Sequence, residues 1–360
     1  MKDVIRNMGA GMLMLGVAAM ANAAAPLINV EAEVGNFIGG AKIGPGQTSG
    51  VKDLQSKLDD LPFRYPNAVA VDSRGNVYVV DSGNDRIVKM DANGNRLAVI
   101  PHSKKGFIST AASTGAYAQQ LNCPEDAAIQ EQASVQQSIS GGNSCVLYVA
   151  DSKNHRIAKF TCDGDYLSEI KTIGGKDLYF PQGIGIGKDG RIGVADTMNH
   201  RVVVLSKDEK LLNEYGDNQL AFPKDVDFDS KGSAWISDFE NHRVVSFDKR
   251  NRVAREIKVA GNGYMKHPVG LVIDNKDRLW VTEMDRHQVD VIDLKTSEST
   301  TFGQFVDGIS GNTSEPYGFD HPKGIAVDPN GLAWVVTPGS HSVHLIKYSD
   351  AASGKRDTEK

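Results

Sequence analysis

The feature that most constrains the fold is an internal repeat that runs along most of the chain. Each copy begins with a proline that follows an aromatic residue, His or Cys. The six pairs are Tyr65–Pro66, Cys123–Pro124, Phe180–Pro181, Phe222–Pro223, His267–Pro268 and His321–Pro322. Successive prolines are 58, 57, 42, 45 and 54 residues apart. Self-similarity at such a spacing is typical of propellers and other repeat architectures.

Each copy has the pattern of short β-strands. After the proline, apolar residues alternate with small or polar ones, and turns with Gly, Asp and Asn follow. A second strand ends 15 residues after the proline in five copies, and 27 residues after it in the second copy, which carries a 12-residue insertion. The shortest periods fit four strands with their turns, which is one blade of a β-propeller.

We therefore predict an all-β protein whose residues 25–350 form a six-bladed β-propeller of four-stranded antiparallel blades. A polar tail, residues 351–360, follows. The last copy supplies only three strands, whereas a strand candidate over residues 27–34 precedes the first copy. This N-terminal strand, placed beside Val343–Tyr348, would close the ring and remove an exposed sheet edge.

The amino terminus has the layout of a secretory signal peptide. Lys2 and Arg6 precede an uncharged stretch from Met8 to Ala21, and small residues follow up to Ala23. The alternative is a membrane anchor, but this stretch is shorter than the about 18 residues that a spanning helix needs. We assign residues 1–24 to the signal peptide, with cleavage near Ala23. The mature chain is then periplasmic or secreted and has no membrane span.

Charge and motifs exclude several functions. The formal net charge of -5 offers no basic face for nucleic acid, so we expect no nucleic-acid partner. A Gly-rich phosphate loop between a strand and a helix is absent from the sequence, so we expect no nucleotide cofactor.

A second motif lies at the end of the second strand in four copies. An Asp there precedes an Arg by five residues across a tight turn, an arrangement in which carboxylate and guanidinium can pair. The pairs are Asp81 and Arg86, Asp151 and Arg156, Asp196 and Arg201, and Asp238 and Arg243. Together with the proline and its strand, this motif resembles the NHL repeat of secreted bacterial propellers. The resemblance covers essentially residues 60–350 and implies a six-bladed β-propeller, in agreement with the six copies.

Histidines recur within or next to this motif. A functional interpretation makes them metal ligands or bases, and a structural one makes them turn residues. Because a metal site needs several ligands at one point, whereas a blade needs one copy each, repetition favours turn residues. These histidines are His155, His200, His242, His287 and His341.

The three cysteines are too few for a disulfide scaffold. If residues 146–151 pair with residues 156–161 as a hairpin, Cys145 lies opposite Cys162, within the reach of a disulfide. Cys123 begins the first strand of the same blade and so lies at its other end. We predict a disulfide between Cys145 and Cys162 and a free Cys123.

Ligand-binding residues are expected where the innermost strands begin, because these positions rim the central channel. Two long segments, residues 101–121 and 301–320, should rise over the same face and carry further contacts. The candidate ligand-binding residues are Tyr65, Asn67, Glu125, Asp126, Gln182, Lys224, Lys323, Phe305 and Tyr317.

The sequence favours an exported binding or assembly protein that engages a protein, peptide or glycan through this face. The alternative is a metal-assisted lyase or hydrolase at the channel mouth, since a relative with this repeat binds zinc through histidines near its channel. The candidates for that role are His267, His321 and Asp225. The cofactor is left open, with zinc or calcium as the metals to consider, and no residue is assigned as a metal ligand.

Overall fold

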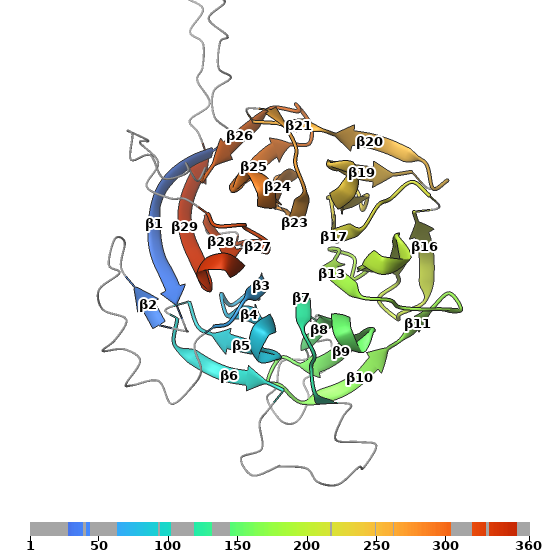
Figure 1. Cartoon of the computed structure of the whole chain (residues 1–360), viewed down its shortest axis with the longest axis horizontal. Helices are drawn as coiled ribbons and strands as arrows, with labels where there is room; N and C mark the ends of the chain where they lie inside the picture. The colour runs from blue at the N-terminus through green and yellow to red at the C-terminus, as the bar shows by residue number, and fades with distance from the viewer. Residues whose placement is uncertain are drawn as a thin grey trace, which may run out of the picture.

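Each repeat copy folds into one antiparallel sheet, and six such sheets surround a central opening in the computed structural model (Figure 1). The structure describes residues 63–101, 119–131, 145–303 and 319–350, apart from 93, 217, 249, 262, 329 and 330, and the backbone of residues 28–38 and 41–43. The predicted signal peptide, the C-terminal tail, Phe305 and Tyr317 lie outside these residues. The all-β six-bladed fold is confirmed.

In the first five blades the first strand faces the opening and later strands lie progressively further out (Figure 1). Blade one contains β3 (Pro66–Val71), β4 (Val77–Asp81), β5 (Arg86–Met90) and β6 (Arg96–Ile100). Blade two contains β7 (Pro124–Glu131), β8 (Cys145–Asp151), β9 (Arg156–Thr161) and β10 (Tyr166–Ile170). Blade three contains β13 (Pro181–Ile186), β14 (Ile192–Asp196), β15 (Arg201–Leu205) and β16 (Leu211–Tyr215).

The other blades follow the same order. Blade four contains β17 (Pro223–Phe228), β18 (Ala234–Asp238), β19 (Arg243–Phe247) and β20 (Val253–Ile257). Blade five contains β23 (Pro268–Ile273), β24 (Arg278–Glu283), β25 (Gln288–Asp293) and β26 (Ser299–Phe302). Two short hairpins lie between blades: β11 (Thr172–Ile173) with β12 (Lys176–Asp177), and β21 (Val259–Ala260) with β22 (Gly263–Tyr264).

Blade six is made from both ends of the described chain. It contains β27 (Ile325–Val327), β28 (Leu332–Thr337) and β29 (Ser342–Asp350). The backbone of β1 (Ile28–Ile38) runs antiparallel to β29, and β2 (Ala41–Ile43) pairs with β1. It is still a prediction that pairing of this N-terminal strand is needed for the stability of the closed ring.

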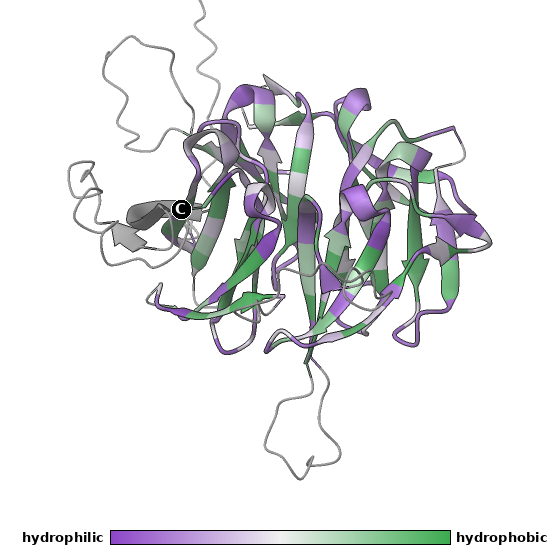
Figure 2. Ribbon diagram, turned by 60° about the horizontal axis from the view of Figure 1, so that its bottom comes forward, coloured by the Kyte–Doolittle hydropathy of each residue, from purple (hydrophilic) through white to green (hydrophobic). Residues whose placement is uncertain are grey.

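The hydrophobic core consists of six clusters, and each cluster joins two adjacent blades. Tyr78 of blade one packs with Leu147 of blade two, for example, and Trp334 of blade six packs with Val79 of blade one. Hydrophobic residues run along the strands, whereas the connecting turns are largely hydrophilic (Figure 2). A blade buries its faces only against its neighbours, so the six sheets depend on one another for stability.

The Asp of each motif ties its turn to the start of the innermost strand. The four Asp side chains are fully buried, and each accepts a hydrogen bond from Nε of its Arg at 2.6 or 2.7 Å. The other carboxylate oxygen accepts a backbone N–H from the second residue before the proline, at 2.7 Å in each blade. The donors on both oxygens offset much of the cost of burying the charge, although burial still raises the pKa of Asp151. The N–H donors are those of Arg64, Asn122, Tyr179 and Ala221.

The second blade contains the one disulfide among the described residues. Val146 lies opposite Thr161 in the hairpin, which is the register expected from the sequence. Cys145 and Cys162 follow this register outward, are 5.6 Å apart at Cα and form the disulfide. Cys123 is free.

We expect alkylation of the unreduced native protein to modify Cys123 and neither of the other two cysteines. After reduction and unfolding, alkylation should modify two further cysteines, Cys145 and Cys162. Reduction should also lower the free energy of unfolding by about 3 kcal/mol, because the disulfide closes a short loop in the unfolded chain. Intact mass and peptide mapping measure both states. A modified Cys145 in unreduced protein would contradict the assignment.

The described parts of the chain contain no helix that has the length and hydrophobicity to cross a membrane.

Candidate functional site

The residue before each proline contacts the preceding blade rather than the channel. In five blades its backbone N–H donates to Nδ1 of the preceding blade's turn histidine, at 3.0 to 3.2 Å. In blade two the acceptor is Asp85, which takes the N–H of Cys123 at 2.6 Å. The donor and acceptor pairs with histidine are Tyr65 and His341, Phe180 and His155, Phe222 and His200, His267 and His242, and His321 and His287.

These contacts explain why the turn histidines repeat. Each sits in the left-handed backbone region at the end of a 3-10 turn, and its ring packs against the side chain before the next proline where that residue is aromatic or His. An imidazole and a backbone N–H therefore link each such pair of blades. The structural interpretation of the five histidines accounts for their positions.

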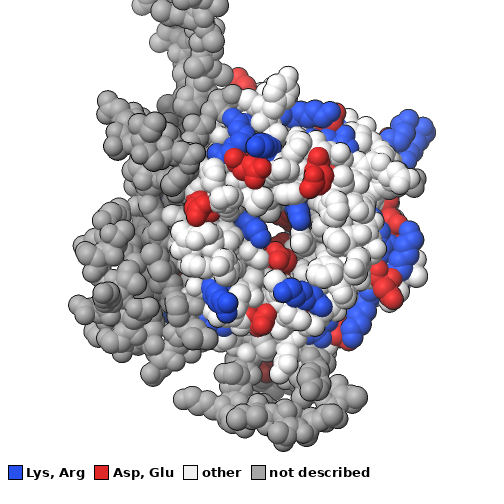
Figure 3. Space-filling view, in the orientation of Figure 1, with Lys and Arg blue, Asp and Glu red and all other residues white. Residues whose placement is uncertain are grey.

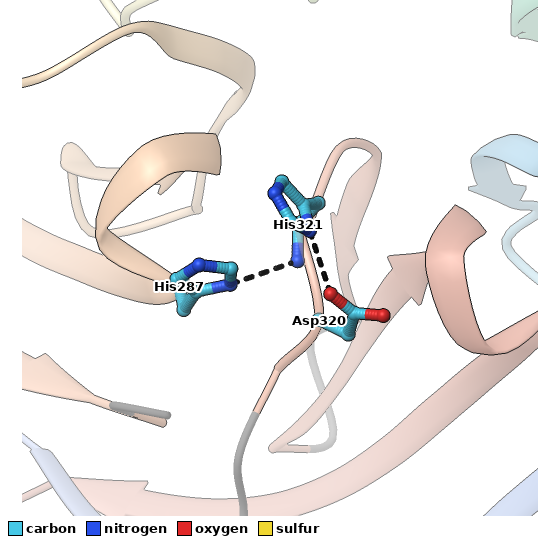
Figure 4. A group of neighbouring side chains, drawn as sticks. All are labelled: His287, Asp320 and His321. Atoms are coloured by element: carbon cyan, nitrogen blue, oxygen red, sulfur yellow. Dashed lines mark hydrogen bonds and ion pairs between the residues drawn. The ribbon is translucent and has the colours of Figure 1, made fainter. Parts of the chain in front are cut away.

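One group of His and acidic residues among the described residues could hold a metal ion. It consists of His287, Asp320 and His321, whose potential ligand atoms lie within 4.8 Å of one another (Figure 4). His287 Nδ1 already accepts the backbone N–H of His321, and His321 Nδ1 lies 2.6 Å from Asp320 Oδ1. An ion bound at these two Nδ1 atoms would have to displace the contact that joins blades five and six. The group fits an inter-blade contact better than a metal centre.

His267 and His321 were candidates for one acid–base or metal pair at the channel mouth, and the structure does not group them there. His267 Nδ1 lies 2.6 Å from Asp285 Oδ2, and its ring stacks on Phe239. His321 pairs with Asp320 as described. Neither histidine is among the residues that line the cavity at the channel mouth, whereas Asp225 is. Each ring instead packs against the blade before its own and pairs with its own acidic residue, Asp285 or Asp320.

A cavity of about 270 Å³ opens at the channel mouth. Lysine or arginine and acidic side chains lie next to one another around the central opening on this face (Figure 3). The cavity brings together six of the nine predicted ligand-binding residues, namely Asn67, Glu125, Asp126, Gln182, Lys224 and Lys323. Tyr65 is not in its lining and is 53% exposed.

Two hydrogen-bonded groups organise the polar part of the cavity. In the first, Asn67 Nδ2 donates to Glu125 Oε2 at 2.9 Å, and Lys323 Nζ lies 3.2 Å from Asn67 Oδ1 and 3.8 Å from Glu125 Oε2. In the second, Lys224 Nζ donates to Gln182 Oε1 at 2.7 Å and lies 4.7 Å from the centre of the Phe239 ring. Burial lowers the pKa of Lys224. The mouth therefore holds two lysines, only one of which has a carboxylate partner among the described residues.

Three partly buried aspartates occupy the channel below the mouth. Asp126, Asp225 and Asp227 face a second cavity of about 280 Å³. Each accepts a backbone N–H from the innermost strand of the next blade: Ile184 at 2.9 Å, Leu271 at 2.8 Å and Ile273 at 2.7 Å, respectively. Burial raises the pKa of Asp126 and of Asp227 to about 7 and that of Asp225 well above its usual value, with Asp126 adding to the rise at Asp225. Near neutral pH Asp126 and Asp227 can therefore hold or release a proton.

The raised pKa of Asp227 predicts a pH dependence of stability. An Asp in an unfolded chain has a pKa of about 3.9, so between about pH 4 and pH 7 the folded state binds more protons, and the free energy of unfolding falls as pH rises through this window. Asp227→Asn keeps an acceptor for Ile273 N–H without a charge. We expect it to raise stability at pH 8 by roughly 1 kcal/mol and to have little effect at pH 4, by urea unfolding. Equal effects at both values would contradict this.

The structure adds cavity residues that sequence reasoning missed. Phe239 and Met284 line the apolar wall together with Val269. Both stand at the first position of the turn after the second strand, where blades one to three have Ser82, Ser152 and Thr197, whose hydroxyls donate to the proline carbonyl of the next blade. In the sequence, Phe239 and Met284 could have been found because they replace the Ser or Thr that other blades have at this position.

Comparisons with known proteins agree with this architecture. The family profile described as NHL repeat matches residues 63–90, 178–205 and 220–247. A comparison with curated protein sequences finds no match. Among solved structures, a streptogramin B lyase has 15% identity and a TM-score of 0.54, over 89% of this chain and all of that one.

Two further solved structures share the fold. A putative gluconolactonase has 14% identity and a TM-score of 0.55, over 80% of this chain and 90% of that one. An auxiliary nutrient binding protein from Bacteroides thetaiotaomicron has 14% identity and a TM-score of 0.55, over 81% of this chain and 71% of that one. At such identities these likenesses establish the fold alone.

Proposed function

Since the chain is an NHL-repeat six-bladed β-propeller, we propose that it is an exported binding or assembly protein whose ligand enters the cavity at the channel mouth. The ligand is a protein, peptide or glycan, or a small part of one. A cavity of about 270 Å³ is slightly smaller than the roughly 300–1,000 Å³ of most small-ligand sites, so it suits one residue or one terminal group.

The observation that carries this proposal is the variety of the residues after the prolines. Positions with a structural role repeat, as the motif Asp within each blade and the turn histidines between blades show. The position after the proline differs among most blades, and its residues converge on one cavity. In blade order it holds Asn67, Glu125, Gln182, Lys224, Val269 and Lys323. Residues that vary within a repeat and converge at one point are free to recognise a ligand.

A metal-assisted lyase or hydrolase is the second candidate, favoured by the channel aspartates. Asp126 and Asp225 both line the mouth cavity, and the pKa of Asp126, which burial raises to about 7, suits proton transfer near neutral pH. Burial also raises the pKa of Asp225. The fold is shared with proteins named as a lyase and a gluconolactonase, as well as with one named as nutrient binding. About one zinc or calcium ion per purified chain, by elemental analysis, would favour the enzyme.

Filling the cavity tests the proposed function. In Val269→Trp the indole would occupy the mouth, while the backbone carbonyl that accepts from Ser237 is unchanged. Thermal-shift screening of the mature chain against peptides and glycans should find ligands that raise the Tm of the wild type and not of this variant. Ligands that stabilise both proteins equally bind elsewhere and would overturn the proposal. Export is tested by the mature N-terminus of the protein recovered outside the cytoplasm.

A further inference from the structure

We propose that the mouth cavity binds a carboxylate between Lys224 and Lys323, and that this carboxylate is the C-terminus of an amino acid or short peptide. This inference rests on the proposed function and names the chemical class of its ligand. It is carried by the hydrogen-bond capacity of the two lysines and by the apolar wall beside them.

The two ammonium groups have donors left for a ligand. Each lysine carries three N–H donors. Among the described residues, Lys224 Nζ has one hydrogen-bond acceptor, Gln182 Oε1, and Lys323 Nζ contacts one amide oxygen and one carboxylate oxygen. Lys224 is half-buried, and Glu125 and Glu240 act on its charge only from beyond ion-pair distance, so a nearer anion would stabilise the ammonium group. A ligand carboxylate supplies that partner and accepts charge-assisted hydrogen bonds.

The acidic groups of the cavity do not prevent this. Glu125 accepts a hydrogen bond from Asn67, lies 3.8 Å from Lys323 Nζ and acts on Lys224 from further away, so its charge is shared between the two lysines. Asp126 and Asp225 each accept two backbone N–H groups, and burial raises the pKa of both carboxyls. Protonation of either carboxyl removes its repulsion and provides a donor to the ligand. Binding should therefore strengthen as pH falls from 8 to 6.

The walls favour a peptide terminus over a charged sugar. Phe239, Val269 and Met284 provide an apolar surface next to Lys224 that suits an aliphatic side chain. The Phe239 ring already stacks on His267, with centroids 4.5 Å apart. It also forms a cation–π contact with the ammonium group of Lys224. It therefore has little open face for stacking against a sugar ring. The side-chain amides of Asn67 and Gln182 can form hydrogen bonds with a peptide bond of the ligand.

Isothermal titration calorimetry of the mature chain at pH 7 and low salt tests the inference. The probes are N-acetylleucine, its neutral amide and glucuronate. We expect N-acetylleucine to bind at least tenfold more tightly than the amide, and Lys224→Met to remove at least tenfold of that affinity. Lys224→Arg should retain most of it. The control is Lys188→Met, which changes a lysine of the lower channel and should bind as the wild type does.

Each other outcome has a definite meaning. Equal binding of acid and amide, no binding of any probe, or full affinity in a folded Lys224→Met variant would overturn the carboxylate site. Tighter binding of glucuronate than of N-acetylleucine, still dependent on Lys224, would overturn the peptide assignment. A third result would be neutral ligands that bind the wild type and the Lys224→Met variant equally but do not bind Val269→Trp. This result would overturn the carboxylate inference and would still support the proposed function.

Discussion

Asp196→Ala is expected to lower the free energy of unfolding by about 3 kcal/mol or more. Asp196 is fully buried and accepts hydrogen bonds from Arg201 Nε at 2.7 Å, Asn199 Nδ2 at 2.8 Å and Tyr179 N at 2.7 Å. The substitution leaves a buried guanidinium with one remaining carboxylate, Glu214, and a backbone N–H without an acceptor. Such a loss is a large part of the about 5–15 kcal/mol by which folded proteins are stable.

The control for this substitution is Asp248→Ala. Asp248 also pairs with an arginine, Arg252, at 2.8 Å, but this pair lies at the surface and the arginine side chain is 67% exposed. Solvent screens such a pair, and among the described residues the Asp248 carboxylate otherwise accepts only the turn N–H groups of Arg250 and Arg252, so a much smaller loss than that of Asp196→Ala is expected. Urea unfolding of both variants, with equal slopes, gives the comparison. If the two variants were equally stable, burial of the motif Asp would not explain its contribution to the stability of the fold.

Much of the fold follows from the sequence because the repeat fixes both the number and the register of the strands. The constant distance from Pro181 to Asp196, repeated in four other blades, places these two residues opposite each other in the hairpin, as observed. The second blade departs only by an insertion between β7 and β8, and its strands pair in the same order. Local periodicity was therefore sufficient for the architecture.

The contacts between blades could not be predicted in the same way. The link from His200 Nδ1 to the N–H of Phe222 requires a left-handed backbone at both residues, and no residue type in the sequence demands this of a phenylalanine. The polar lining of the cavity was easier to predict, because in a propeller the residues after the prolines must lie at the rim of the channel. Its apolar wall was missed because Phe239 and Met284 come from turns whose other members form hydrogen bonds between blades.

Removal of residues 27–38 from the mature chain is expected to abolish cooperative unfolding. This deletion takes away β1, whose backbone pairs with β29 from Ile28 opposite Asp350 to Ile38 opposite Ser342. The nine-residue β29 would become an unpaired edge, although its Val343 and Ile346 belong to the clusters that join blade six to both of its neighbours. A long exposed edge also favours aggregation.

Differential scanning calorimetry measures this prediction, with removal of residues 351–360 as the control. Because that segment follows β29 and lies beyond the predicted propeller, its loss should leave the melting transition unchanged. A broad or absent transition in the first protein alone means that the N-terminal strand completes the ring, since each blade is stable only when both neighbours cover it. A wild-type transition in both proteins would show instead that the ring holds with a three-stranded sixth blade.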